Sequence, residues 1–175
     1  MPIKSLIRTI PDYPKPGIMF RDITTLLKDS DGFCSTIAKL VQHYRDQGID
    51  RIAGIESRGF IIGAALAVQL GVGFVPIRKK GKLPGPTVGQ DYQLEYGSEY
   101  IEMHVDAVSR GQKILLIDDL IASGGTAAAA VALIESMGGC IVGCGFVIDL
   151  PDLGGRTRLE RLGHKVHALC TFEGD

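Results

Sequence analysis

The segment Ile114–Ile117 constrains the fold of this chain most. Its four consecutive residues are apolar, which is typical of a parallel strand that is buried on both faces of a sheet. Further short apolar runs alternate with helical patterns along the chain. We expect strands at Arg51–Ile55, Gly73–Ile77, Lys113–Ile117, Ile141–Asp149 and Lys165–Leu169, and helices at Asp31–Gln47, Phe60–Leu70 and Thr126–Met137. This alternation predicts an α/β fold: a mostly parallel twisted sheet with helices on both faces.

Two segments interrupt the alternation. Residues 1–20 carry four prolines, and we expect them to wrap the surface after a short helix at Ile3–Thr9. The insertion Gly81–Gly111 contains alternating patterns typical of a protruding hairpin, and insertions of this length are usually lids or binding loops. No repeat or linker divides the sequence. We therefore expect one domain over residues 1–175, with a flexible lid at 81–111 and a strand, loop and helix at 113–137.

The charge balance excludes several classes of partner. The chain has 19 basic and 20 acidic side chains and a net charge of −1, which argues against broad electrostatic binding to nucleic acid or to an anionic membrane. No uncharged apolar run reaches the roughly 18 residues that a membrane span requires. We expect a cytoplasmic protein. Its four cysteines are too few for a disulfide framework, and Cys140, Cys144 and Cys170 lie in apolar runs where cysteine usually serves as a core residue.

The strongest functional motif follows the strand Lys113–Ile117. Asp118 and Asp119 come directly after the apolar run, at the carboxyl end of a strand, where ligands bind in open α/β sheets. Ser123, Gly124, Gly125 and Thr126 then begin a helix. The free N–H groups and the dipole of a helix start favour an anion, and glycines let the backbone approach a phosphate closely.

Two carboxylates beside an anion site require an explanation, because they repel phosphate. Ribose hydroxyls supply one: Asp118 and Asp119 can accept hydrogen bonds from two neighbouring hydroxyl groups while the loop holds the phosphate. The motif therefore predicts a site for a phosphorylated ribose. The alternative is an ordinary strand-to-helix turn with a serine cap. A Walker-type phosphate loop and a complete dinucleotide-binding fingerprint are both absent from the sequence.

The segment Asp118–Thr126 resembles the 5-phosphoribosyl-1-pyrophosphate (PRPP) loop of type I phosphoribosyltransferases. Further segments are similar to the branch of that family that acts on adenine, and they follow the family's order along nearly the whole chain. These segments are Pro14–Ile23, Gly54–Phe60, Ile77–Thr87 and Leu94–Gly97. Ser123 stands where the family often has threonine, and either hydroxyl can donate to phosphate. The resemblance implies transfer of a 5-phosphoribosyl group from PRPP to adenine, which gives AMP and pyrophosphate in purine salvage.

The resemblance also implies a role for each further segment. Residues 1–35 form a hood with the base pocket, in which Phe20 stacks on adenine and the backbone of Met19 and Arg21 reads its edge. Glu95, in the lid, acts as the catalytic proton-transfer group. The resemblance also implies which residues bind the two parts of PRPP. Ribose and 5-phosphate are bound by Asp118, Asp119, Ala122, Ser123, Gly124, Gly125 and Thr126, and pyrophosphate is bound by Ser57, Arg58, Arg78, Lys79 and Lys82.

Several simpler interpretations remain for these residues. Phe20 is more often a core residue than a stacking platform, Glu95 is an exposed strand glutamate by composition alone, and Lys80 is expected to be solvated. His164 and His167 point to opposite faces of a strand-like segment, which disfavours zinc. Mg²⁺ is expected instead, bridging diphosphate and ribose oxygens with mostly water around it, and no protein residue is assigned as a ligand.

Two other functions compete with this assignment. The chain could transfer phosphoribose to another base, such as xanthine or orotate, or it could be a non-catalytic regulator that senses PRPP. A regulator would need a DNA-binding module or a basic face, and the chain has neither spare length nor net positive charge. A bare nucleotide-binding scaffold would have no use for a lid. The family resemblance also implies a homodimer.

Overall fold

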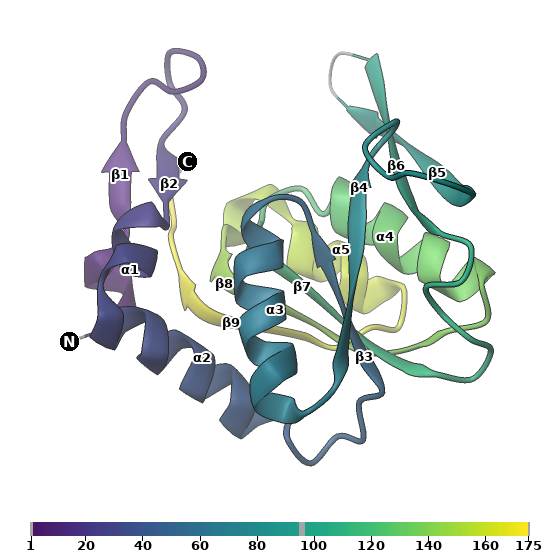
Figure 1. The fold of residues 1–175 in the computed structure, drawn as a ribbon. Coiled ribbons are helices and arrows are strands. Elements are labelled where there is room, and N and C mark those ends of the chain that lie inside the picture. The colour runs from purple at the N-terminus through teal and green to yellow at the C-terminus, as the bar shows by residue number, and fades with distance from the viewer. Residues whose placement is uncertain (1, 95–96, 175) are drawn as a thin grey trace.

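The computed structural model describes residues 2–94 and 97–174, which form a seven-stranded sheet with helices on both faces (Figure 1). Five strands run parallel, and the two remaining strands form an antiparallel hairpin at one edge. In spatial order they are β5 (Thr87–Leu94), β6 (Gly97–His104), β4 (Gly73–Lys79), β3 (Arg51–Ile55), β7 (Lys113–Ile121), β8 (Cys140–Asp149) and β9 (Val166–Thr171). The predicted mostly parallel α/β sheet is confirmed.

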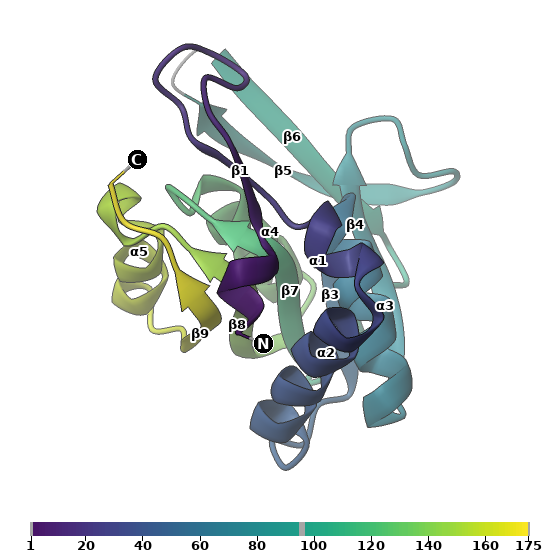
Figure 2. The same ribbon diagram turned by 90° about the vertical axis from the view of Figure 1, so that its left-hand side faces the viewer.

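Helices lie on both faces of the sheet (Figure 2), and one hydrophobic core lies between the sheet and each helical layer. Helices α2 (Ser30–Tyr44) and α3 (Arg58–Leu70) cover one face, and α4 (Gly125–Ser136) and α5 (Gly155–Arg161) cover the other. Successive residues of β7 enter alternate cores because strand side chains alternate between faces. The four residues Ile114–Ile117 have no exposed surface. The apolar run therefore belongs to a strand that is buried on both faces, as the sequence predicts.

The predicted elements match the observed ones closely in the middle of the chain. β3 has the predicted bounds, and the other predicted strands and helices differ from the structure mainly at their ends. The largest difference is at β7, which continues four residues beyond the predicted Ile117. The predicted hairpin is confirmed as β5 and β6, which pair from Thr87 opposite His104 to Leu94 opposite Gly97.

The N-terminal prediction is wrong in part. The expected helix at Ile3–Thr9 is only a 3₁₀ turn, η1 (Ile3–Leu6), and the chain then continues as strand β1 (Arg8–Ile10). β1 pairs antiparallel with β2 (Phe20–Asp22), and the two strands and their loop form a projecting arm. A short helix α1 (Thr24–Lys28), a second 3₁₀ turn η2 (Pro151–Leu153) and α5 were also not predicted. Elements of three to seven residues contain too few periodic positions to be detected.

The arm and the β5–β6 hairpin both project beyond the carboxyl ends of the parallel strands, one on each side of the molecule (Figure 1). This is the edge where β3 and β7 end and α3 and α4 begin. Two projecting segments therefore border the carboxyl ends of the central parallel strands, where the sequence places the ligand.

The cysteine prediction holds for Cys144 and fails for Cys140. Cys144 is fully buried, and burial together with the nearby Glu135 raises the pKa of its thiol to about 12. Cys170 is partly buried, whereas Cys140 is exposed because it begins β8 at the end of the sheet. Within the described residues, no helix has the length and apolar character that crossing a membrane requires.

Gly54 permits the close contact between β3 and α3. A Cβ at this position would lie 2.6 Å from Cε2 of Phe74 and 2.8 Å from the carbonyl oxygen of Gly59. We predict that Gly54→Ala lowers the free energy of unfolding by about 1–3 kcal/mol, because overpacked cores strain their neighbours. Urea denaturation measures this change. Gly73→Ala is the matched control, since its nearest neighbour would be 3.9 Å away; an equal loss in both variants would contradict the packing argument.

Candidate active site

A cavity of about 370 Å³ lies at the carboxyl edge of the sheet and gathers many of the residues singled out from the sequence. Three separate parts of the chain line it: the base of the arm, the start of α3, and the segment that joins β7 to α4. Its lining is Ile18, Met19, Phe20, Arg21, Arg58, Asp118, Asp119, Leu120, Ile121, Ala122, Ser123, Gly124, Gly125, Thr126, Ala127, Leu150 and Leu153. The proposed ribose, phosphate and base residues thus share one cavity.

The two acids occupy a different part of the strand from the one predicted. Asp118 and Asp119 lie within β7, which remains paired with β8 as far as Ile121. On its other side β7 loses its partner earlier, because the pairing with β3 ends at Ile117. The acids therefore lie on a strand that is held on one edge and open on the other. Rigid pairing on one edge fixes the carboxylates while α3 begins beside them.

Asp119 and Arg58 form an ion pair inside this cavity. Arg58 Nε donates to Oδ2 of Asp119, whose side chain is almost fully buried. Burial lowers the pKa of Arg58, but the charge of Asp119 outweighs that effect and the net shift is upward. Burial and the charge of Asp119 raise the pKa of Asp118 well above its ordinary value. One carboxylate is thus neutralised by an arginine, and its neighbour has a weakened tendency to ionise.

The loop before α4 has the geometry of an anion site. Gly124 has a φ of 81°, in the left-handed region that glycine adopts without strain, and α4 begins at Gly125. A Cβ on Gly124 would lie 2.9 Å from Cα of Gly155, at the start of α5. Gly155 N–H also donates to the carbonyl of Ala122 at 2.9 Å. The free amides of the first turn of α4 can therefore bind phosphate, as expected from the sequence.

The arm places Phe20 over the same cavity. Its ring packs edge-on against Tyr13 at 5.2 Å between centroids, and the guanidinium of Arg58 lies 5.9 Å from its centroid. Phe20 is only partly buried, and Met19 is exposed. The interpretation of Phe20 as a core residue is therefore not supported, and its ring is available to stack on a flat ligand.

Contacts with Phe172, near the C-terminus, hold the arm in place. The Arg21 guanidinium lies 4.5 Å from the ring centroid of Phe172, and Lys4 Nζ lies 4.7 Å from it. Arg21 also donates to Oγ1 of Thr9 at 2.7 Å. The sequence contains no local signal for this contact, because Phe172 is far from the arm along the chain. The tertiary structure thus anchors a proposed base-binding residue on the C-terminal segment.

The residues proposed for pyrophosphate are divided between two places. Arg58 lines the cavity, whereas Ser57, Arg78, Lys79 and Lys82 are outside its lining. A carboxylate missed in the sequence connects the two places: Glu56 accepts from the backbone N–H of Lys79 at 2.6 Å and from Arg78 Nε at 3.3 Å. Glu56 thereby fixes the start of the basic segment beside the end of β3.

Glu95 lies outside the described residues, and strand β5 ends at Leu94. The carbonyl oxygen of Gln93 lies 3.8 Å from the point that a Cβ on Gly125 would occupy. The hairpin therefore reaches the start of α4. The same point lies 3.7 Å from Nη1 of Arg158, a residue of α5 that sequence reasoning missed. The sequence did not predict helix α5, so it gave no indication that Arg158 lies near the loop.

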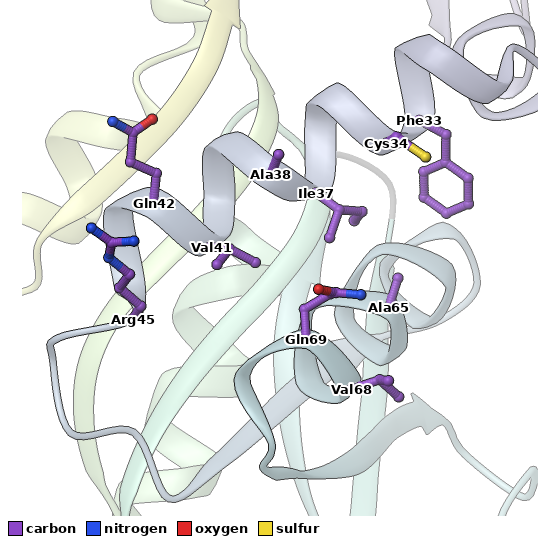
Figure 3. Close-up of a pocket in the computed structure, with 10 residues that line it drawn as sticks. All are labelled: Phe33, Cys34, Ile37, Ala38, Val41, Gln42, Arg45, Ala65, Val68 and Gln69. Carbon is purple, nitrogen blue, oxygen red and sulfur yellow. The ribbon is translucent and has the colours of Figure 1, made fainter.

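A larger hollow, of about 770 Å³, lies elsewhere on the molecule (Figure 3). It is a groove between α2 and α3, and most of its side chains are apolar, such as Ile37, Val41 and Val68. It contains none of the residues proposed from the sequence. We assign the chemistry to the smaller cavity, because that cavity holds the acids, the arginine and the helix start.

Comparison with known proteins identifies the class that this fold and site define. The phosphoribosyl transferase domain family matches residues 25–164. The adenine phosphoribosyltransferase of Nitrosospira multiformis is 66% identical over 175 residues, which is the full length of both chains. The chain therefore belongs to the phosphoribosyltransferase family, in its adenine phosphoribosyltransferase branch.

Solved structures agree with this assignment. The adenine phosphoribosyltransferase of Rhodothermus marinus is 49% identical, with a TM-score of 0.92 over 97% of this chain and 96% of that one. The enzyme of Saccharomyces cerevisiae, solved with adenine and an imino-altritol bisphosphate, is 38% identical, with a TM-score of 0.89 over 96% of each chain. The fold expected from the sequence resemblance is confirmed.

The carboxyl group of Asp22, at the base of the arm, makes the stability of the fold depend on pH. Burial raises the pKa of Asp22, but hydrogen bonds from Arg8 and Thr24 outweigh it and lower the pKa to about 2. A carboxylate with a lowered folded-state pKa stabilises the fold above its ordinary pKa of 3.8, and the stabilisation disappears as the pH falls through about 2.

We therefore predict that Asp22→Asn lowers the free energy of unfolding at neutral pH. The difference from the unmodified protein should shrink as the pH falls from 4 toward 2. Chemical denaturation of both proteins across this range measures the difference. A difference that is constant with pH would show that the charge of Asp22 contributes nothing.

Proposed function

We propose that this chain transfers the 5-phosphoribosyl group of PRPP to adenine, giving AMP and pyrophosphate in purine salvage. One observation carries the proposal: a single cavity contains an acidic pair, a helix start with free amides, and an aromatic ring from the arm. These three features suit the ribose hydroxyls, the 5-phosphate and the base respectively. The close relatives carry the same activity in their names.

The reaction joins a ring nitrogen of adenine to C1 of the ribose. The bond from C1 to the pyrophosphate oxygen breaks, and its electron pair leaves with pyrophosphate, so positive charge develops on the ribose. The imidazole ring of adenine gives up one proton in the reaction, and Glu95 is the proposed proton-transfer group. Asp118 and Asp119 accept hydrogen bonds from the ribose hydroxyls, while Ala122 to Thr126 hold the 5-phosphate. Fixed charges placed at a developing charge usually contribute most to such catalysis.

The arm recognises the base. Phe20 stacks on the purine, and the backbone groups of Met19 and Arg21 bind its Watson–Crick edge. A 6-oxopurine presents the opposite donor and acceptor pattern there, so binding it would leave buried polar groups without partners. Unpaired buried polar groups are costly, and this cost gives the pocket its preference for adenine.

Basic residues bind the leaving pyrophosphate. Arg58 lies in the cavity, and Ser57 is next to it at the start of α3. Glu56 holds Arg78 and Lys79 beside the end of β3, and Lys82 follows in the same basic segment. We propose that the insertion 81–111 closes over the bound substrates and keeps water from the charged ribose.

Mg²⁺ is the proposed cofactor. Within residues 2–94 and 97–174, no group of three acidic, histidine or cysteine side chains could hold a metal ion. We propose that diphosphate and ribose oxygens and water would supply most of the ligands of this ion. When bound, Mg²⁺ neutralises part of the diphosphate charge, and Arg58 and the basic segment contribute the protein's share.

We also propose that two copies of the chain form a homodimer. The family resemblance suggests this assembly, and the outer surface of α3 supports it. Val68 is 77% exposed and Ile61 is 45% exposed, and Val68 lines the apolar groove between α2 and α3 (Figure 3). Burying these side chains against a second copy would remove apolar surface from water.

Assays with several bases side by side test the proposed reaction. We expect AMP formation from adenine and PRPP, loss of turnover on chelation of Mg²⁺, and recovery when Mg²⁺ is restored. Hypoxanthine, guanine, xanthine and orotate should be poor substrates, because they mismatch the arm. Preference for a 6-oxopurine would refute the base assignment, and a protein that binds PRPP without turnover would be a sensor instead.

Glu95 is tested by substitution. Proton transfer to or from a purine ring by a positioned carboxyl typically contributes 10²–10⁴-fold to rate. We predict that Glu95→Gln lowers kcat by at least about tenfold and changes KM for adenine and PRPP little. Asp91→Asn is the control, since Asp91 is an exposed carboxylate of the same hairpin. Unchanged turnover in Glu95→Gln would remove this residue from the mechanism.

A further inference from the structure

The anion site before α4 has an uneven distribution of charge. Its amides and the hydroxyls of Ser123 and Thr126 can donate to phosphate, and the charged residues of the cavity lining are Arg21, Arg58, Asp118 and Asp119. Both cations of this lining already have partners: Arg58 pairs with Asp119, and Arg21 donates to Thr9 and lies against Phe172. A dianionic phosphate would therefore gain from a cation placed on the outer side of the loop.

Arg158 occupies that position. Its Nη1 atom lies 3.7 Å from the point where a Cβ would stand on Gly125, and Oγ of Ser123 lies 3.8 Å from the same point. Gly125 is the first residue of α4. A guanidinium and a hydroxyl thus approach the helix start from two different segments of the chain, next to the free amides of its first turn.

The packing of α5 holds Arg158 in place. Leu159, the next residue, is fully buried in the core shared with α4. At the start of α5, Gly155 donates to the carbonyl of Ala122, and Gly155 packs so closely on Gly124 that a Cβ on either glycine would clash. The start of α5 and the loop are therefore held together, which places the backbone of Arg158 beside the loop.

The guanidinium of Arg158 is also free to take a ligand. Across residues 2–94 and 97–174 it makes no side-chain hydrogen bond and no ion pair, whereas Arg156 on the same helix pairs with both Asp149 and Glu160. An arginine that served only the fold would be expected to have such partners. Arginine also binds phosphate well, since its planar fork matches two phosphate oxygens.

We propose that Arg158 binds the 5-phosphate of PRPP and AMP from the outer side of the loop. This proposal rests on the proposed function, because it assumes that the loop holds a phosphate. Arg158 adds a charge to a site otherwise made of amides and hydroxyls.

Binding of AMP and steady-state kinetics together test the role of Arg158. For Arg158→Met we expect the dissociation constant of AMP and KM for PRPP to rise about tenfold, which is the loss expected for a hydrogen bond to a charged group that is partly exposed. KM for adenine and inhibition by pyrophosphate should change less than about twofold, because neither ligand carries a 5-phosphate. Arg158→Lys should retain part of the affinity, since it keeps the charge but loses the fork.

Arg161→Met is the matched control, because Arg161 is also an exposed arginine of α5. It should leave the affinity for AMP unchanged. Unchanged AMP affinity in Arg158→Met, or equal losses for AMP, adenine and pyrophosphate, would overturn the proposal. The unmodified protein separates the two hypotheses: if it forms AMP normally while Arg158→Met binds AMP normally, only the role of Arg158 fails.

Discussion

The pairing of β7 is the constraint on which the rest of the structure depends. Its residues Ile114–Ile117 are fully buried and pack into both cores, so the strand cannot shift by one residue without exchanging the side chains of its two faces. β8 pairs with it to Ile121, whereas β3 stops opposite Ile117. The same strand therefore stabilises the centre of the sheet and presents two acids at an open edge. The phosphate loop follows directly and inherits this fixed position.

The protein has a net charge of −1, and charged groups at the site are offset by neighbours of opposite charge. Arg58 neutralises Asp119, and the raised pKa of Asp118 reflects how costly a second buried charge is next to the first. Hydroxyl groups of a ribose are suitable partners for such acids, because they donate hydrogen bonds without adding charge. Beside the loop, the guanidinium of Arg158 makes no ion pair within residues 2–94 and 97–174, and we propose that it adds positive charge to the phosphate site.

Contacts between distant parts of the chain complete the site. The arm is held at its base by Arg8 and Asp22, and Arg21 rests on Phe172 near the C-terminus. The hairpin reaches the start of α4 through Gln93. The arm and the hairpin are thus attached to the sheet at two separate places.

The sequence by itself determined the α/β class, the central strands and the loop Asp118–Thr126, because these depend on local patterns of apolar residues, acids and glycines. Its resemblance to a family supplied the base and the reaction. The tertiary structure decided what no local pattern contains. β7 stays paired with β8 beyond the point where its pairing with β3 ends, and Glu56 binds Arg78. Arg158 and Phe172 approach the site from the C-terminal region. These features join residues far apart in the chain, and only packing of the complete sheet brings them together.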